Sequence, residues 1–344
     1  DSGISFYDQG FFEIFLDIFD RKFKNRNILV TGSTGGGKSV LVNKIVHTLL
    51  PEHPAVILDK GGSFQKLCLY HDGYNLEGKI NPLDFKCPYY LREFILSVVD
   101  KADFNKLRSA QLLKEIKDFL LSYQGNSFFD LLEYLEDSFL NISLYFEDIK
   151  DFLTSDVSLK KDLLYVNIEN FPKTQVASLI IYVLEYYKNI KVAQKVLVFD
   201  EAWSFLAGHE EYIDEKFREI RKSGALAIAI AQGFKDFSNL NGQLYTSLTN
   251  NSYFKFFFSQ DHIDDHDVSD FDNQKIKELE YEKGSYSDCY FKTQDAKLKK
   301  ILRIFLAPLE YELFHTEEDQ NELFYKFYSD NRGYFLSNAK TIDS

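Results

Sequence analysis

Short runs of apolar residues along the chain alternate with longer stretches in which apolar side chains recur every three or four positions. Six of the short runs are rich in β-branched residues, which favours strands, and several are apolar at consecutive positions, as in strands covered on both faces. Strands that alternate with helices predict an α/β fold with a mainly parallel central sheet. The predicted strands are residues 27–31, 55–59, 163–168, 195–200, 225–231 and 253–258.

The alternation stops between residues 91 and 160, where the apolar spacing is helical, proline is absent and Gly125 is the only glycine. This pattern predicts an all-α insertion subdomain over 91–160, between two parts of one core, 1–90 and 161–344. Residues 284–293 and 299–307 predict a hairpin at an edge of the sheet, followed by a helix over 318–328.

Charge and cysteine usage make some classes of protein less expected. The net charge of −13 repels a phosphate backbone, so it does not indicate nucleic acid as a partner, although a local basic channel would allow it. The three cysteines are far apart, which favours neither a disulfide framework nor a zinc site and fits a reducing cytosol. No apolar run is long enough to span a bilayer, and no signal sequence opens the chain.

The motif GSTGGGKS, Gly32 to Ser39, directly follows a predicted strand and opens a helical pattern that ends before Pro51. This context identifies a P-loop, in which glycines let backbone N–H groups converge on phosphate oxygens and the helix N-terminus adds partial positive charge. In such a loop the lysine contacts the β- and γ-phosphates and the serine hydroxyl ligates Mg²⁺. The predicted ATP-binding residues are Gly32, Ser33, Thr34, Gly35, Gly36, Gly37, Lys38, Ser39 and Val40, with Ser39 also a metal ligand.

The sequence KVLVFDEAW, residues 195–203, is an apolar strand that ends in two adjacent carboxylates. Ligands of open α/β sheets bind at the carboxyl edge, so this strand end is expected beside the P-loop. Asp200 is predicted to hold Mg²⁺ through water, and Glu201 to activate the attacking water as general base.

Three further polar residues are candidates for catalysis. Gln232 follows the predicted strand 225–231 and could orient the water or sense the γ-phosphate. Arg218 and Arg221 lie near the end of a helix that stops at Gly224. Their spacing fits an arginine finger that acts on a neighbouring subunit's nucleotide, and it fits equally a cationic helix end that complements the helix dipole.

Two other features are interpreted as structural. His262 and His266 lie four apart in an acidic stretch, but no strand or helix orients the carboxylates there, so a solvated loop is expected instead of a metal site. The single tryptophan, Trp203, is expected in the core.

A family resemblance follows from several motifs in order. Besides GSTGGGKS and VFDEAW, the chain carries LDKGGSFQKLC (58–68), NPLDF (81–85), FREIRKSGA (217–225) and AIAQGFKDF (229–237). Together these resemble the TraC-like ATPases of conjugative type IV secretion systems, within the HerA/FtsK superfamily. The DEAW tetrad, the Arg-x-x-Arg-Lys helix and the following strand that ends in Gln set this family apart from general P-loop ATPases.

The resemblance implies a RecA-like motor domain with an all-α insertion, assembly into a hexamer, and a cytoplasmic position at the inner-membrane base of a secretion channel, whose components it would contact. It favours inter-subunit roles for Arg218 and Arg221, and it adds Asp59 as a residue that faces the nucleotide. Members of this family usually carry a large N-terminal domain, and none precedes the P-loop in this sequence, so membrane association is not expected of this segment alone.

The function predicted from these features is ATP hydrolysis that powers pilus assembly or substrate transfer. Two alternatives stay open at this level: a hexameric DNA translocase or coupling ATPase, and a structural subunit that binds nucleotide with little turnover.

Overall fold

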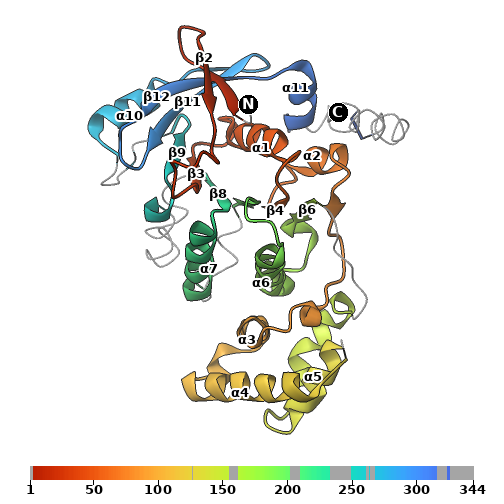
Figure 1. Cartoon of the computed structure of the whole chain (residues 1–344). Coiled ribbons are helices and arrows are strands. Elements are labelled where there is room, and N and C mark those ends of the chain that lie inside the picture. Colours follow the sequence, from red (N-terminus) through yellow and green to blue (C-terminus); the bar gives the residue numbers. More distant parts are fainter. Residues whose placement is uncertain are drawn as a thin grey trace. The chain divides into compact units, whose positions relative to one another are not determined.

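The computed structural model describes residues 3–125, 127–154, 162–201, 210–232, 249–260, 263, 268–315 and 324–325. The chain forms two compact units (Figure 1). The first comprises residues 1–75, 161–167 and 192–344, and the second comprises residues 76–160 and 168–191. The predicted insertion, 91–160, lies within the second unit, which also includes the segments that flank it. Of the predicted helix 318–328, only Phe324 and Tyr325 are among the described residues, and both are helical.

In the described residues, a twelve-stranded sheet forms the centre of the first unit. Seven adjacent strands of this sheet run parallel to one another, and crossover connections join them along the chain. The predicted α/β fold with a mainly parallel sheet is therefore confirmed. In spatial order these strands are β9 (Phe254–Phe257), β3 (Ile28–Thr31), β8 (Leu226–Ala231), β7 (Val196–Asp200), β4 (Ala55–Asp59), β6 (Leu163–Asn167) and β5 (Tyr74–Asn75).

Antiparallel strands extend the sheet beyond β9. The predicted hairpin is present as β11 (Tyr286–Thr293) and β12 (Lys299–Phe305), and β11 pairs with both β9 and the short β10 (Tyr281–Glu282). The outermost pair, β1 (Ile4–Tyr7) and β2 (Glu13–Leu16), was not predicted from the sequence. The extension places the hairpin beside β9, and β9 is the neighbour of β3, the strand that leads into the P-loop.

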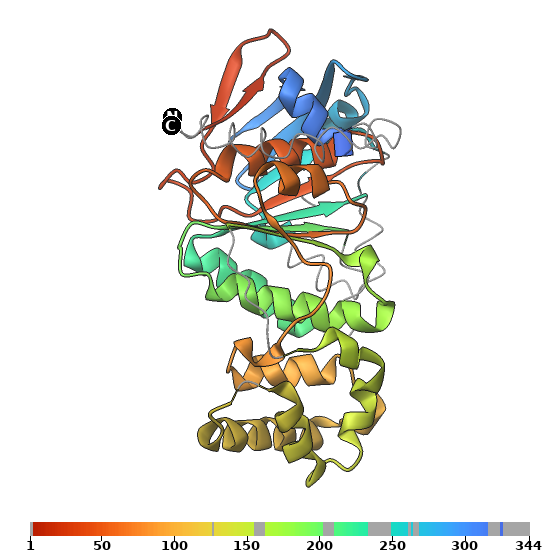
Figure 2. The same cartoon turned by 90° about the vertical axis from the view of Figure 1, so that its right-hand side faces the viewer.

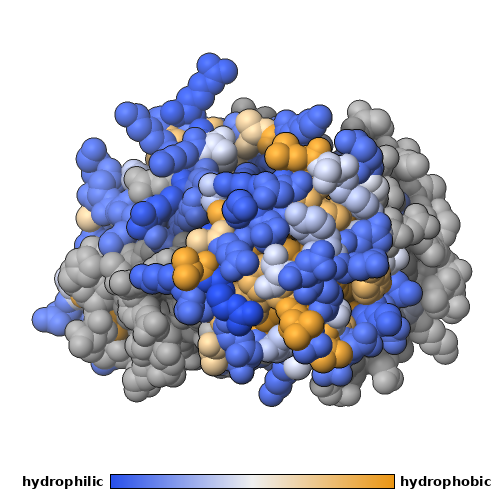
Figure 3. Space-filling model, turned by 90° about the horizontal axis from the view of Figure 1, so that it is seen from below, coloured by the Kyte–Doolittle hydropathy of each residue, from blue (hydrophilic) through white to orange (hydrophobic). Residues whose placement is uncertain are grey.

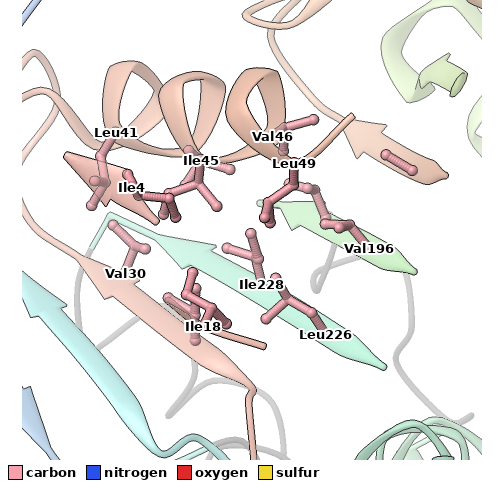
Figure 4. Packing of buried hydrophobic residues seen from close by; sticks show 14 of the residues in the cluster. Ile4, Ile18, Val30, Leu41, Ile45, Val46, Leu49, Val196, Leu226 and Ile228 are labelled. Atoms are coloured by element: carbon pink, nitrogen blue, oxygen red, sulfur yellow. The ribbon is translucent and has the colours of Figure 1, made fainter. Parts of the chain in front are cut away.

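Helix α1 (Lys38–Leu49) packs on one face of the sheet through apolar positions spaced by three and four, Leu41, Ile45, Val46 and Leu49. Figure 4 shows these side chains above Val30, Ile228 and Val196, which come from three different parallel strands. Each such side chain contributes about 1.5–3 kcal/mol when fully buried. This packing fixes where the N-terminus of α1 lies relative to the strand ends. Helix α2 (Gln65–Tyr70) lies on the same face, and α11 (Pro308–Phe314) contacts both helices.

Strand β8 reads Leu-Ala-Ile-Ala-Ile-Ala, and its two faces differ in size. Leu226, Ile228 and Ile230 belong to the core beneath α1, whereas the alanines face the opposite side, where helix α7 (Glu210–Ser223) contacts the strand. The rings of Phe217 on α7 and Phe199 on β7 lie 5.5 Å apart on that side. Figure 2 shows the sheet between the two helical layers. Helix α10 (Asp270–Lys277) contacts β11.

The second unit is helical in its described part, apart from one isolated bridge between Ile80 and Leu153. Figure 3 shows a mainly hydrophilic face with apolar side chains exposed at separate places. No helix in the described ranges is both long and apolar enough to cross a membrane. The helices of this unit are α3 (Pro88–Leu96), α4 (Lys106–Ser122), α5 (Phe128–Glu136) and α6 (Lys173–Asn189), with short 3-10 turns η1 (Pro82–Asp84), η2 (Lys101–Asp103) and η4 (Ile168–Asn170) and the longer η3 (Ile142–Phe152).

Candidate functional site

The turn between β3 and α1 holds the glycine-rich motif in a conformation that only glycine fits. Gly37 immediately precedes α1 with φ of 102°, in the left-handed region that other residues rarely adopt. A Cβ on Gly37 would lie 2.7 Å from Oγ of Ser287, and one on Gly32 would lie 2.5 Å from Cβ of Phe258. Any larger residue at either position would therefore displace the loop from β9 and β11.

The first turn of α1 can accept an anion. Its N-cap, Gly37, has no side chain to satisfy the N–H groups, and the turn contains no acidic residue. The helix end therefore keeps its unsatisfied donors and its partial positive charge. Lys38 Nζ donates to the carbonyl oxygen of Ser33 at 3.0 Å, which places the ammonium over the loop. Ser39 and Val40 follow in the same turn, both half-buried.

The end of β7 places Asp200 in a buried, negatively charged environment. Its side chain is only 6% exposed. Burial raises the pKa of Asp200 well above its usual range, the nearby charges of Asp59 and Glu201 raise it further, and Lys38 opposes them. The structure thus brings together the three acidic residues and the lysine that were predicted from distant parts of the sequence.

Asp59, at the end of the neighbouring strand β4, is fully buried and strongly hydrogen-bonded. Its Oδ1 accepts from the N–H of Gly61 at 3.0 Å, and its Oδ2 accepts from the N–H of Phe64 at 3.1 Å and the hydroxyl of Tyr165 at 3.0 Å. These bonds order the turn into α2. A contact of Asp59 with the nucleotide stays a prediction, and the structure adds that this carboxylate organises the loop beside Asp200.

Glu201 adopts a backbone conformation that is unusual for a residue with a side chain. Its φ is 52°, and its N–H donates to the carbonyl oxygen of Ile230 at 3.4 Å. A left-handed residue other than glycine costs about 1–3 kcal/mol and persists where the surroundings impose it, often at functional sites. The left-handed conformation turns the chain sharply after Asp200. The side chains of Asp200 and Glu201 therefore do not point to opposite faces of the sheet, as neighbouring residues within a strand do.

The remaining predicted residues are less enclosed. Gln232 directly follows β8 and is exposed. The Arg218 side chain is 64% exposed and pairs with Asp214 of the same helix at 2.7 Å. The backbone of Arg221 is helical, but its side chain lies outside the described part of the structure, as do Trp203, His262 and His266.

Three polar contacts to the P-loop and to the end of the strand before it were not predicted. Ser287 Oγ donates to the carbonyl oxygen of Gly36 at 2.8 Å, Gln260 Nε2 donates to Thr31 Oγ1 at 3.0 Å, and the carbonyl oxygen of Ser259 accepts from the N–H of Ser33 at 3.2 Å. Gln260 could have been found, because it follows a predicted strand as Gln232 does. Ser287 could not, since it is 251 residues from Gly36 in sequence.

These groups fit a magnesium-bound nucleotide. The loop packs so closely against Phe258 and Ser287 that a Cβ at Gly32 or Gly37 would clash, and it leads into a helix N-terminus beside the Lys38 ammonium. Asp200 is a buried carboxylate whose negative environment a divalent cation would neutralise. Ser39 and Asp200 are the residues that would hold the metal.

In the metal-free protein, Asp200→Asn should raise the free energy of unfolding at neutral pH by about 1–3 kcal/mol. The native pKa of Asp200 lies above its unfolded value. The contribution of this carboxyl to stability is therefore fully present below about pH 4, where it is protonated in both states. That contribution is lost as the pH rises through the native pKa. Asparagine has no charge to bury at any pH. Thermal melting in chelator between about pH 5 and pH 8 measures this difference, which should grow with pH. Asp148→Asn, at an exposed position, is the control, and a variant at Asp200 that melts below the wild type at the upper pH contradicts the prediction.

Comparison with protein families matches residues 11–122 to the TraG P-loop domain. This segment contains the P-loop, α1 and β4. Comparison with solved structures finds VirB4 of Thermoanaerobacter pseudethanolicus, with a TM-score of 0.70 and 18% sequence identity over 90% of this chain and 97% of that one. The resemblance to TraC-like ATPases is confirmed. The RecA-like fold is thus shared with VirB4 along nearly the whole of both chains.

Structures of the plasmid coupling protein TrwB share the fold as well. The structure in complex with ADP and Mg²⁺ matches with a TM-score of 0.52 and 16% identity, over 83% of this chain and 86% of that one. Another, in complex with a non-hydrolysable GTP analogue, matches with a TM-score of 0.51 and 15% identity, over 82% and 85%. Comparison with curated proteins yields no match.

Proposed function

We propose that this chain is the motor domain of an ATPase that converts ATP and water to ADP and phosphate and powers a type IV secretion or conjugation machine. One observation carries the proposal: the glycine cradle at the head of α1 and the carboxylates at the end of β7 meet at one edge of the sheet, with Lys38 electrostatically coupled to Asp200. Phosphoryl transfer to water requires hydrogen-bond donors to the phosphates next to a carboxylate that binds the metal.

In this mechanism the backbone N–H groups of Gly35 to Lys38 and the Lys38 ammonium bind the phosphates. Mg²⁺, held by Ser39 and Asp200, would neutralise charge on the phosphate oxygens. Glu201 accepts a proton from the attacking water, and Gln232 orients that water from the end of β8. Asp59 keeps the loop after β4 in place beside Asp200 through its three hydrogen bonds.

The proposal includes assembly of the chain with copies of itself, as a hexamer, on the cytoplasmic side of the inner membrane against the channel components. Arg218 supports this part, because its side chain is exposed on α7 and can reach another subunit by releasing Asp214. Stabilisation of the transition state by such an arginine typically accelerates hydrolysis by about 10³–10⁵-fold.

Mixing two inactive variants tests whether Arg218 acts between subunits. Arg218→Ala has an intact P-loop and Lys38→Ala has an intact arginine, so a mixed oligomer contains complete sites where these two subunits meet. Turnover should recover to about a quarter of the wild-type rate in an equal mixture, as expected for random neighbours in a ring. A mixture of Lys38→Ala with Glu201→Gln is the control, since both defects lie in one subunit's own site. No recovery in the first mixture, with an active wild type, contradicts the arrangement.

A further inference from the structure

Helix α4 of the helical unit carries a stripe of exposed side chains on the face opposite its buried residues. The buried face consists of Leu112, Ile116 and Phe119. The exposed positions recur at alternating steps of three and four residues, which places all of them on one side of a helix. In Figure 1, α4 runs along the outer edge of this unit. The stripe consists of Leu107, Ala110, Lys114, Lys117 and Leu121.

The stripe on α4 has the composition of an interface. The two leucines at its ends are 78% and 82% exposed, so each presents most of an apolar side chain to the surface. Apolar residues at this spacing are the pattern with which a helix packs against a partner. Between the leucines, Lys114 pairs with Asp118 at 3.8 Å, and the Lys117 ammonium lies 5.1 Å from the centre of the Tyr89 ring. A partner for this stripe therefore needs both apolar surface and negative charge.

A pocket of about 220 Å³ lies between α5 and η3 of the same unit. Its apolar lining comes from Phe129, Leu132 and Phe146, the last two of which are buried. Leu140, just before η3, and Leu144, in its first turn, are 82% and 65% exposed. A protein cavity of about 150 Å³ accommodates one benzene molecule, so this pocket has room for a leucine side chain.

The charge around this pocket is negative. Glu133 and Glu136 line it from α5 and Glu147 lines it from η3, against one lysine, Lys150. Lys150 lies 3.8 Å from Glu147, and such an exposed pair contributes little. Residues 128–152, which form α5 and η3, contain seven acidic side chains and one basic side chain. Helix α4 contains four basic and two acidic side chains, so the two surfaces carry opposite net charges.

We propose that the stripe on α4 of one copy binds the acidic pocket between α5 and η3 of a second copy. Lys114 and Lys117 then face Glu133 and Glu147, and one leucine of the stripe enters the pocket. A second copy is the occupant that the charges favour, because every copy carries both complementary surfaces. A contact between two different surfaces is heterologous, and such contacts can close into a ring. The inference rests on the self-assembly proposed above and adds a contact between subunits that is separate from the nucleotide site.

Reversing the charge of each surface tests this contact in the full chain, with sedimentation velocity over a range of protein concentrations. Lys114→Glu/Lys117→Glu and Glu133→Lys/Glu147→Lys should each weaken self-association by about tenfold or more, because like charges then face each other. An equal mixture of the two variants should regain the wild-type association, since every contact between them again joins opposite charges. Unfolded chains would give no such recovery, so the mixture also shows that both variants keep their fold.

Two further variants separate a specific contact from a general effect of charge. Leu107→Ser/Leu121→Ser leaves the charge unchanged and should still weaken self-association severalfold, because it removes the apolar part of the stripe. Lys297→Glu/Lys300→Glu is the matched control. It changes the net charge as much as the reversal on α4 does, but at exposed positions of the β11–β12 hairpin, and it should associate like the wild type.

The proposal is overturned if either reversed variant alone associates like the wild type, or if the mixture of the two shows no recovery. A wild type that stays monomeric at every concentration, with and without Mg-ATP, overturns it as well. Failure of the proposed function has a different signature, because a wild type that does not hydrolyse ATP would still show the same pattern of weakened and recovered association.

Discussion

Lys38→Ala should abolish ATP turnover and weaken Mg-ATP binding by about a hundredfold or more. Lys38 is nearly buried, with 7% of its surface exposed, and its ammonium is the cation that opposes the charges around Asp200. Without it, the phosphates would meet three carboxylates and only the backbone N–H groups. Removing one partner of a buried, charge-assisted contact typically costs about 2–5 kcal/mol, and about 2.8 kcal/mol already equals a hundredfold in affinity.

Calorimetric titration with Mg-ATP and a phosphate-release assay measure the two effects of Lys38→Ala. The matched control is Lys297→Ala, because that side chain is 82% exposed and pairs with Asp295, two residues away in sequence. Thermal melting of both variants shows that the fold is kept. If Lys38→Ala binds Mg-ATP with wild-type affinity, the P-loop does not hold the phosphates as proposed.

Glu201→Gln should lower the turnover number by about 10²–10⁴-fold, the usual contribution of a general base, while the affinity for ATP changes only a few-fold. The amide has the size of the carboxylate, so the strained turn at φ of 52° should persist. It cannot accept the proton of the attacking water at neutral pH. The side chain is also not a predicted ligand of the metal or the phosphates, so the bound state should form normally.

Single-turnover hydrolysis and nucleotide titration on the same preparation separate these two effects of Glu201→Gln. Glu215→Gln, at an exposed position on α7, is the control for loss of one negative charge. Hydrolysis by Glu201→Gln at the wild-type rate would assign the general base to another residue. A loss of turnover with an equal loss of affinity would instead give Glu201 a binding role.

The sequence by itself determined the local elements of the site. The P-loop could be predicted because its glycines, Lys38 and Ser39 lie within eight consecutive residues between a strand and a helix, so one short segment contains the whole cradle. Asp200 and Glu201 were equally clear, since a parallel sheet places all of its strand ends at one edge. Consecutive apolar residues identified the buried parallel strands, because every position of such a strand is covered on its own face of the sheet.

Only the tertiary structure decided which distant residues meet. The contact of Ser287 with Gly36, the pairing of β11 with β9, and the hydrogen bond from Tyr165 to Asp59 all join segments that are far apart in the chain. The unusual φ of Glu201 also depends on its surroundings, because nothing in the dipeptide Asp-Glu favours it. Secondary structure and motif geometry depend on near neighbours in the chain, whereas strand order and the walls of a pocket depend on how the whole core packs. The sequence therefore located the proposed phosphate site, and the fold added the contacts that Ser259 and Ser287 make with its loop.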